Sequence, residues 1–165
     1  MADRDLRIRN HKDRITEYPA AASQTIEVGD PVALDSNGRV IIATAVSAAL
    51  LGICAKAVSS TSAGDPIFVY DDPDVEFEIA ADDPTEVLQT VVGETHDLIV
   101  DSGTFKVNLG ATATNVLRVK AIKGFYDPNA DDSPYEGSTL VGDFTPGWRD
   151  SAQVICEIAA HVLSA

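Results

Sequence analysis

Short apolar runs, separated by clusters of Gly, Pro, Asp and Asn, fill the chain from residue 26 onward. This spacing is typical of β-strands joined by turns, because glycine and asparagine supply turn conformations and proline interrupts regular structure. The sequence therefore predicts a mainly β protein, built as a small β-barrel or β-sandwich with long polar loops. Its 165 residues suit one domain with a single core.

The strongest local signal is the Asn37-Gly38 pair, which lies between the apolar runs Val32–Leu34 and Arg39–Ala45. Asn-Gly between two such runs favours a β-hairpin with a type I′ turn, which needs positive φ at both central residues. We expect these two runs to be paired strands.

A second pair of runs, Ile67–Tyr70 and Val75–Ile79, flanks the acidic segment Asp71–Asp74. We expect them to pair across that segment. Apolar residues of the second run alternate with Glu76 and Glu78. Such a period of two predicts a half-buried strand with an acidic outer face.

One segment of the chain has an internal echo. Val28–Leu34 resembles Ala63–Val69, thirty-five residues later, and both contain Gly-Asp-Pro followed by apolar residues. Shorter echoes are Val92–Glu94 and Val141–Asp143. Gly supplies positive φ, Asp bonds nearby N–H groups, and Pro opens a strand where its missing donor costs little. The echo predicts a barrel with similar corners.

Further strands are expected at Leu50–Val58, Asp97–Val100, Lys106–Leu109, Val116–Phe125, Thr139–Val141 and Val154–Val162. The last run also suits a helix face that Asp150 or Ser151 would cap, and we favour the strand. Tyr126–Ser138 is expected to be a long polar loop. Asp82–Glu94 is a second candidate loop, with a short strand or helical turn inside it.

The N-terminal segment differs from the rest of the chain. Residues 1–17 carry five basic and four acidic groups, and no usable apolar period follows up to residue 25. We interpret residues 1–25 as an extended arm and residues 26–165 as a single β-barrel domain. The arm would be either a frayed terminus or a segment that orders on a neighbouring subunit.

The formal net charge is −14. A field of this sign repels phosphate backbones and anionic membranes, so we expect neither nucleic-acid nor membrane partners. The charge indicates either solubility alone or an encounter with a basic protein surface. No signal peptide or membrane span is evident, so synthesis in a cytoplasm is expected. Cys54 and Cys156 lie in apolar stretches, which favours buried thiols over a disulfide.

No catalytic motif is recognisable. The three histidines have no metal-ligand spacing, and nucleophile-elbow, phosphate-loop and dinucleotide motifs are absent. The clusters Asp71–Asp74 and Asp127–Asp132 could offer oxygen ligands to Ca²⁺, but both lack the EF-hand frame, and turn chemistry explains them equally well. We therefore expect no enzyme activity, no metal and no cofactor. Trp148 would be a corner residue or an interface anchor.

One family shares the order of these segments. Ile26–Asp35, then Gly38–Val40, Leu51–Ala57 and Gly64–Val69 resemble the small β-barrel of the capsid cement, or head-decoration, proteins of tailed double-stranded DNA bacteriophages. The resemblance covers about residues 24–70. It implies a structural virion protein that binds the outer capsid surface as a homotrimer, with the major capsid protein as its partner.

The resemblance also suggests contact residues. We expect Leu6, Arg7, Ile8 and Arg9 of the arm to contact the shell, and Tyr126, Tyr135 and Trp148 to contact other copies of the chain. The alternative function is a β binding module of a phage tail, a fibre or a cell surface. A hydrolase or Ca²⁺-dependent enzyme, and a shell- or tube-forming subunit, are weaker alternatives.

Overall fold

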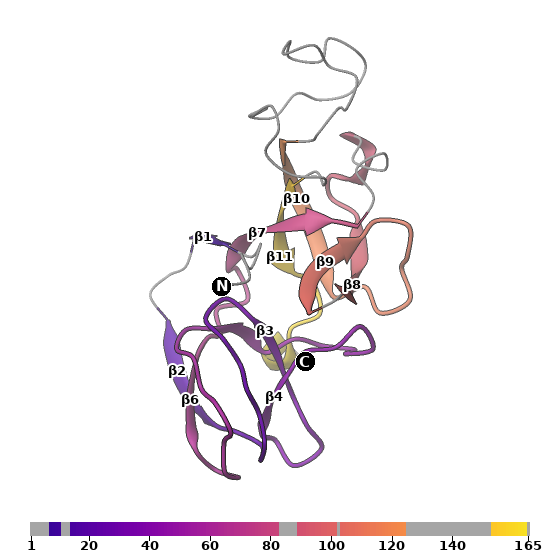
Figure 1. The fold of residues 1–165 in the computed structure, drawn as a ribbon. Helices are drawn as coiled ribbons and strands as arrows, with labels where there is room; N and C mark the ends of the chain where they lie inside the picture. Colours follow the sequence, from indigo (N-terminus) through magenta and orange to yellow (C-terminus); the bar gives the residue numbers. More distant parts are fainter. Residues whose placement is uncertain (1–6, 11–13, 83–88, 102, 125–152, 165) are drawn as a thin grey trace.

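The computed structural model describes residues 7–10, 14–82, 89–101, 103–124 and 153–164 (Figure 1). In these ranges eleven strands form two sheets, with short 3₁₀ turns η2 (Gln89–Val91) and η3 (Val162–Ser164). No helix in the described ranges is long and apolar enough to cross a membrane. The mainly β class with a small barrel is confirmed.

The first sheet closes into a barrel, which we call barrel I. Its strands are β2 (Ile15–Pro19), β3 (Pro31–Leu34), β4 (Val40–Ile42), β5 (Gly52–Cys54) and β6 (Pro66–Tyr70). They are paired in the antiparallel order β2-β6-β5-β3-β4. A parallel bridge between Ala20 and Val40 joins the end of β2 to β4 and completes the ring.

The second sheet also forms a ring, which we call barrel II. Its strands are β7 (Glu76–Ala81), β8 (Thr95–Asp101), β9 (Thr104–Asn108), β10 (Leu117–Gly124) and β11 (Gln153–Ile158). The order is β7-β11-β10-β8-β9, and a parallel pairing of β9 with β7 closes it. Strand β1 (Arg7–Asn10) adds to β7 from outside the ring.

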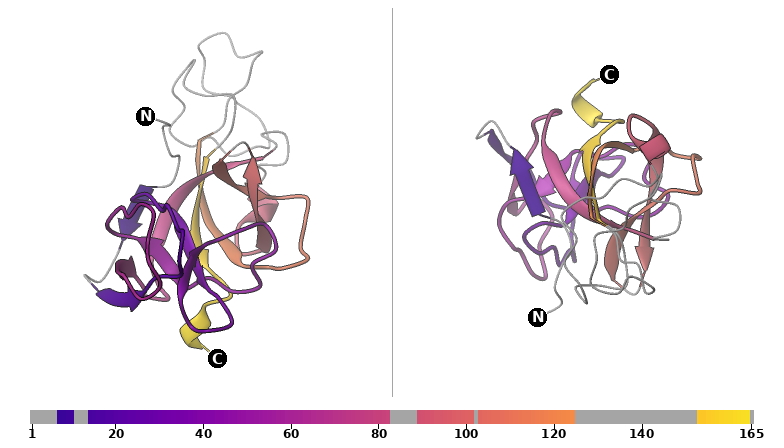
Figure 2. Two further views of the ribbon diagram at one scale, coloured as in Figure 1. Left: turned by 60° about the horizontal axis from the view of Figure 1, so that its bottom comes forward. Right: turned by 90° about the horizontal axis from the view of Figure 1, so that it is seen from above.

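The two rings have the same connectivity. In each, the first strand pairs with the fifth, the fifth with the fourth, the fourth with the second and the second with the third. In each, the third strand returns to the first through a parallel contact. Figure 2 shows the two barrels packed side by side. Residues 26–165, expected as one barrel, therefore contain most of barrel I and the described strands of barrel II.

The barrels share part of their cores. The interior of barrel I is a cluster of eight buried side chains: Ala20, Ile26, Val32, Val40, Leu51, Cys54, Ile67 and Val69. A larger cluster fills barrel II and extends to Ala33, Ala43, Leu50 and Ile53 of the barrel I segment. Val32 and Ala33 thus face opposite sides of β3, so one face of β3 fills barrel I while the other packs against barrel II.

The Gly-Asp-Pro segments form the expected corners. Gly29 has φ 92°, the Asp30 carboxylate accepts the N–H of Glu27 at 2.8 Å, and Pro31 is the first residue of β3. Because the turn needs a residue with positive φ, glycine occupies it without the steric cost of a Cβ.

The second copy repeats this geometry. Gly64 has φ 97°, the Asp65 carboxylate accepts the N–H of Ser62 at 2.7 Å, and Pro66 begins β6. Gly93, in the shorter echo, has φ 93° and precedes β8. The predicted strand entrances are therefore confirmed in all three; the echo at residues 141–143 lies outside the described residues.

The predicted hairpin forms, but its turn is of another type. β3 and β4 pair as expected, and Gly38 has φ 72°, whereas Asn37 does not have positive φ. The N–H of Gly38 donates to the carbonyl of Asp35 at 3.0 Å, and the N–H of Asp35 donates to the carbonyl of Arg39 at 2.8 Å. This is a three-residue loop with a glycine bulge. The type I′ prediction was wrong because the Asp35 carboxylate accepts the N–H groups of Asn37 and Arg39 and favours the longer loop.

The expected pairing of Ile67–Tyr70 with Val75–Ile79 was wrong. β6 pairs with β2 and β5 in barrel I, whereas β7 pairs with β1, β9 and β11 in barrel II. The acidic segment between them carries the chain from one barrel to the other. The acidic outer face was also wrong in part, because Glu78 is buried, whereas Glu76 is partly exposed.

The remaining runs that the structure describes each contain a strand, although the one expected at Leu50–Val58 is limited to β5, Gly52–Cys54. The final run forms the strand β11 rather than a helix, and η2 forms a helical turn inside the second candidate loop. Residues 139–141 and the whole of the long loop at 126–138 lie outside the described residues. Cys54 and Cys156 are buried free thiols, as expected, and burial raises the pKa of Cys156 well above its ordinary range.

Candidate contact region and inter-barrel junction

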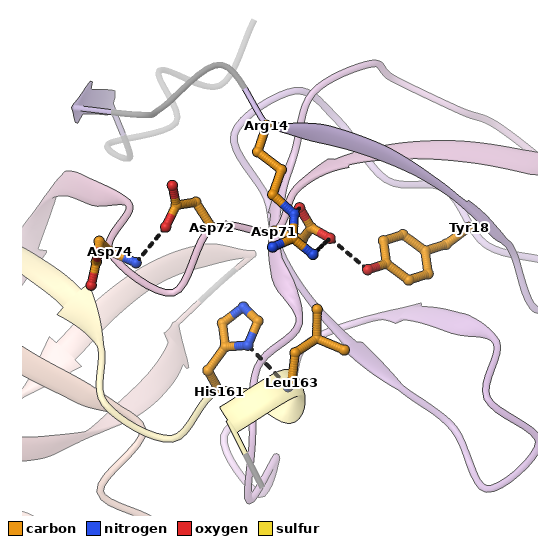
Figure 3. A network of polar contacts seen from close by, with 7 residues as sticks. All are labelled: Arg14, Tyr18, Asp71, Asp72, Asp74, His161 and Leu163. Carbon is orange, nitrogen blue, oxygen red and sulfur yellow. Dashed lines mark hydrogen bonds and ion pairs between the residues drawn. The ribbon is translucent and has the colours of Figure 1, made fainter.

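A buried carboxylate lies where the chain crosses between the barrels. Asp71, directly after β6, has a fully buried side chain. The Nε of Arg14 lies 3.0 Å from Oδ1, and Nη2 of Arg14 donates to Oδ2 at 3.3 Å. The hydroxyl of Tyr18 donates to the same Oδ2 at 2.6 Å (Figure 3). A buried charge needs such partners to offset its lost hydration.

These contacts join the ends of distant segments. Arg14 immediately precedes β2, Tyr18 lies within β2, and Asp71 lies fifty-seven residues after Arg14. Because β2 also pairs with β6, the three side chains hold the start of β2 against the crossing point. Burial, together with the hydrogen bond to Asp71 and its negative charge, raises the pKa of Tyr18 to about 12. The hydroxyl therefore remains a donor at neutral pH.

His161 closes the other side of the junction. It follows β11 and forms a parallel bridge with Leu50, and its Nδ1 accepts the N–H of Leu163 at 3.0 Å. A ring nitrogen that accepts is unprotonated, so the hydrogen is on Nε2. Burial is the largest cause of a lowered pKa, which keeps the imidazole neutral.

The rest of the acidic segment forms a turn. The Asp72 carboxylate accepts the N–H of Asp74 at 2.9 Å, and the Asp72 carbonyl accepts the N–H of Val75 at 3.0 Å. Among the described residues, no group of three or more His, Cys, Asp and Glu is arranged to hold a metal ion. The cluster at 127–132 lies outside them. The junction is thus organised to join two barrels.

Barrel II has its own carboxylate anchor. Asp97 of β8 accepts the N–H groups of Ala113, Thr114 and Asn115 at 2.9, 2.7 and 2.8 Å. Burial opposes ionisation of Asp97, but the backbone donors outweigh it and lower its pKa. This carboxylate fixes the loop that connects β9 to β10.

On the described surface of barrel II, two basic side chains form ion pairs with one glutamate. Arg118 and Lys120 alternate with buried residues along β10 and project from its exposed side. Both reach Glu157 of β11, at 3.1 Å each. The pair is therefore partly neutralised.

The expected contact residues fall in two groups. Arg7, Ile8 and Arg9 belong to β1, whose register places Arg7 opposite Glu78 and Ile8 opposite Phe77. Leu6, Tyr126, Tyr135 and Trp148 lie outside the described residues. Their roles in contacts with the shell and between copies remain predictions.

The junction was not foreseen from the sequence. Asp71 is one of eleven carboxylates between residues 71 and 101, and nothing in the local pattern separates it from its neighbours. Arg14 and Tyr18 were placed in an arm with no assigned partner. The available signal is the position of Asp71 at the end of an apolar strand, where a side chain passes from the surface into the core.

A family model now gives the resemblance an independent basis. Residues 11–69 match the model of phage cement proteins. The resemblance to capsid cement proteins is confirmed over this range, which runs from just before β2 to the last but one residue of β6 and so corresponds to barrel I. No curated protein matches the chain. The match indicates a structural role associated with the phage capsid.

Proposed function

We propose that this protein decorates the outer surface of a phage capsid and stabilises it by bridging neighbouring major capsid proteins. The observation that carries the proposal is the match of barrel I to the phage cement family. Two small barrels that share part of a core suit a role in which the protein resists deformation. We propose further that it has no enzyme activity and is made in the host cytoplasm before assembly.

The contact surfaces are part of the same proposal. The N-terminal residues Leu6, Arg7, Ile8 and Arg9 would contact the shell, where their basic groups suit an acidic partner surface. Tyr126, Tyr135 and Trp148 would contact other copies in a homotrimer. Repetition of a weak contact over an icosahedral shell gives strong retention, because later contacts form at high effective concentration.

Binding to expanded shells tests the function. Purified protein is mixed with expanded shells that lack it, and bound protein is measured after sedimentation. We expect saturable binding and an increase in the temperature at which the shells break. Binding to tails or fibres without binding to shells would instead favour the alternative of a tail-associated β module.

Deletion of residues 1–10 tests the arm. We expect weaker shell binding with the fold retained, because β1 lies outside the ring of barrel II. Unchanged shell binding would contradict the arm assignment. The native mass of the full chain tests the trimer: three chains of 17.4 kDa give about 52 kDa.

A further inference from the structure

The shared connectivity allows the edges of the two barrels to be compared. β2 of barrel I corresponds to β7 of barrel II, because each pairs with the last strand of its own ring and each meets the third strand through a parallel contact. That parallel contact covers only the end of each strand. The remaining part of the same edge is therefore available to another strand in both barrels.

In barrel II this edge is occupied. β1 pairs with β7 in antiparallel register, with Ile8 opposite Phe77 and Asn10 opposite Glu76. The pairing with β9 begins further along, at Ala80. The occupying segment reads Arg-Ile-Arg-Asn, an alternation of basic or polar and apolar residues against a strand that carries Glu76 and Glu78.

In barrel I the corresponding edge has no paired strand among the residues that the structure describes. The N–H of Ala20 donates toward β6, to Asp65, and the N–H of Ala21 donates toward β4, to Val40. Backbone groups alternate in direction along a strand, so those of Ile15 and Glu17 point away from β6. Among the described residues, no strand pairs with β2 on that side before Ala20.

On the β4 side of this open edge, the backbone N–H group already has a hydrogen-bond partner. The N–H of Ile42 in β4 donates to the side-chain oxygen of Gln24 at 3.1 Å. The open groups therefore belong to β2, where Ile15 is 48% exposed and Glu17 is exposed. Pro19 lacks an N–H and limits the length of any added pairing. Figure 1 shows β2 at the outer margin of barrel I.

We propose that the β2 edge, residues Ile15–Tyr18, binds an extended segment of the shell protein as an added strand. This inference rests on the proposed function and names the partner's chemistry: alternating basic and apolar residues, as in β1. Main-chain hydrogen bonds to Ile15 and Glu17 would supply affinity, and Glu17 with the acidic body would select a basic segment. The segment β1 shows that such a sequence fits the equivalent edge of this fold.

Proline at position 17 is the sharpest test. Glu17→Pro removes an N–H that faces the open side and leaves the bonds between β2 and β6 in place. We expect at least a tenfold loss of shell binding. Glu17→Ala keeps the N–H and should lose much less, and Ser36→Pro, in the β3–β4 turn, controls for proline itself. Melting curves of all variants establish that they fold.

A charge variant covers the case in which Glu17→Pro fails to fold. Glu17→Arg keeps the backbone donor and places a positive charge on an exposed position, so binding of a basic segment should fall severalfold. If the wild-type protein binds shells and both Glu17→Pro and Glu17→Arg bind them equally well, the edge proposal is overturned and the proposed function stands. Absence of wild-type binding to shells would overturn both.

The native mass decides whether the occupant is another copy. The edge proposal expects the same mass for the wild-type protein and Glu17→Pro. A shift to a smaller species in Glu17→Pro, with shell binding per copy unchanged, would assign the β2 edge to contacts between copies and overturn the assignment to the shell protein.

Discussion

Barrel I and barrel II share one connectivity but differ in how they are closed. Barrel I has strands of three to five residues and closes through a single bridge at Ala20, whereas barrel II has strands of five to eight residues and an extra strand on its edge. Only barrel I lies within the matched family range. Two unlike sequences can therefore form the same strand order, provided that both keep the corners and the alternation of apolar residues.

A substitution in the core that the two barrels share should cause the greatest loss of stability. Phe77 is fully buried in the cluster that fills barrel II and reaches barrel I residues. Phe77→Ala should cost about 3–5 kcal/mol, as large-to-small core changes do. Because the cluster spans both barrels, urea unfolding followed by amide hydrogen exchange should show both barrels losing protection together. Loss confined to barrel II would show that the barrels unfold independently.

The junction gives the next largest effect. Among the described residues, Arg14→Ala leaves the fully buried Asp71 carboxylate with only the Tyr18 hydroxyl as a side-chain donor. We expect a loss of about 3 kcal/mol, at the low end for breaking a buried pair, because the Arg14 side chain is 54% exposed. The double variant Arg14→Ala with Asp71→Asn should recover part of the stability. Equal stabilities of the single and double variants would contradict the pairing.

Two strands of barrel I approach each other closely at Gly52. A Cβ at Gly52 of β5 would overlap the backbone carbonyl of Tyr70 in β6. Gly52→Ala should therefore cost about 1–3 kcal/mol by overpacking. Gly103 is the matched control: its φ is +82°, but a Cβ there would meet no atom within 4 Å, so only backbone strain opposes Gly103→Ala. Chemical denaturation of both variants compares steric overlap with strain.

Acid should affect the junction before it affects barrel II. The folded-state pKa of His161 is lowered from 6.5, so the unfolded chain binds the proton more readily, and stability falls as the pH drops below about 6.5. Asp97 has its folded pKa lowered from 3.8, so its contribution is present above that value and is lost as the pH falls through the folded pKa.

Melting temperatures between pH 7 and pH 2 test this order. His161→Gln should flatten the curve between pH 7 and pH 5, and Asp97→Asn should flatten it only below about pH 4. Because single groups contribute modestly, we expect these shifts to be the smallest of the series. An unchanged slope in His161→Gln between pH 7 and pH 5 would contradict a buried neutral histidine at the junction.

Local chemistry explains what the sequence predicted well. Gly29, Gly64 and Gly93 have the positive φ that their turns need, and residues 30 and 65 supply the expected aspartate bonds. These features depend on residues within a few positions of one another, so they can be recognised without knowledge of the fold. At Asn37-Gly38 only the predicted type of the turn was wrong, because hydrogen bonds to the Asp35 carboxylate favour a longer loop.

The β class, the strand corners and the resemblance of residues 24–70 to cement proteins could all be recognised from the residues alone. Tertiary structure decided which strands share a ring: β6 and β7 are adjacent in sequence yet belong to different barrels. It also decided that Asp71 and Glu78, similar in sequence to many exposed carboxylates, are buried. Strand pairing and burial depend on partners far along the chain, whereas turns and the alternation of apolar residues depend on neighbouring positions.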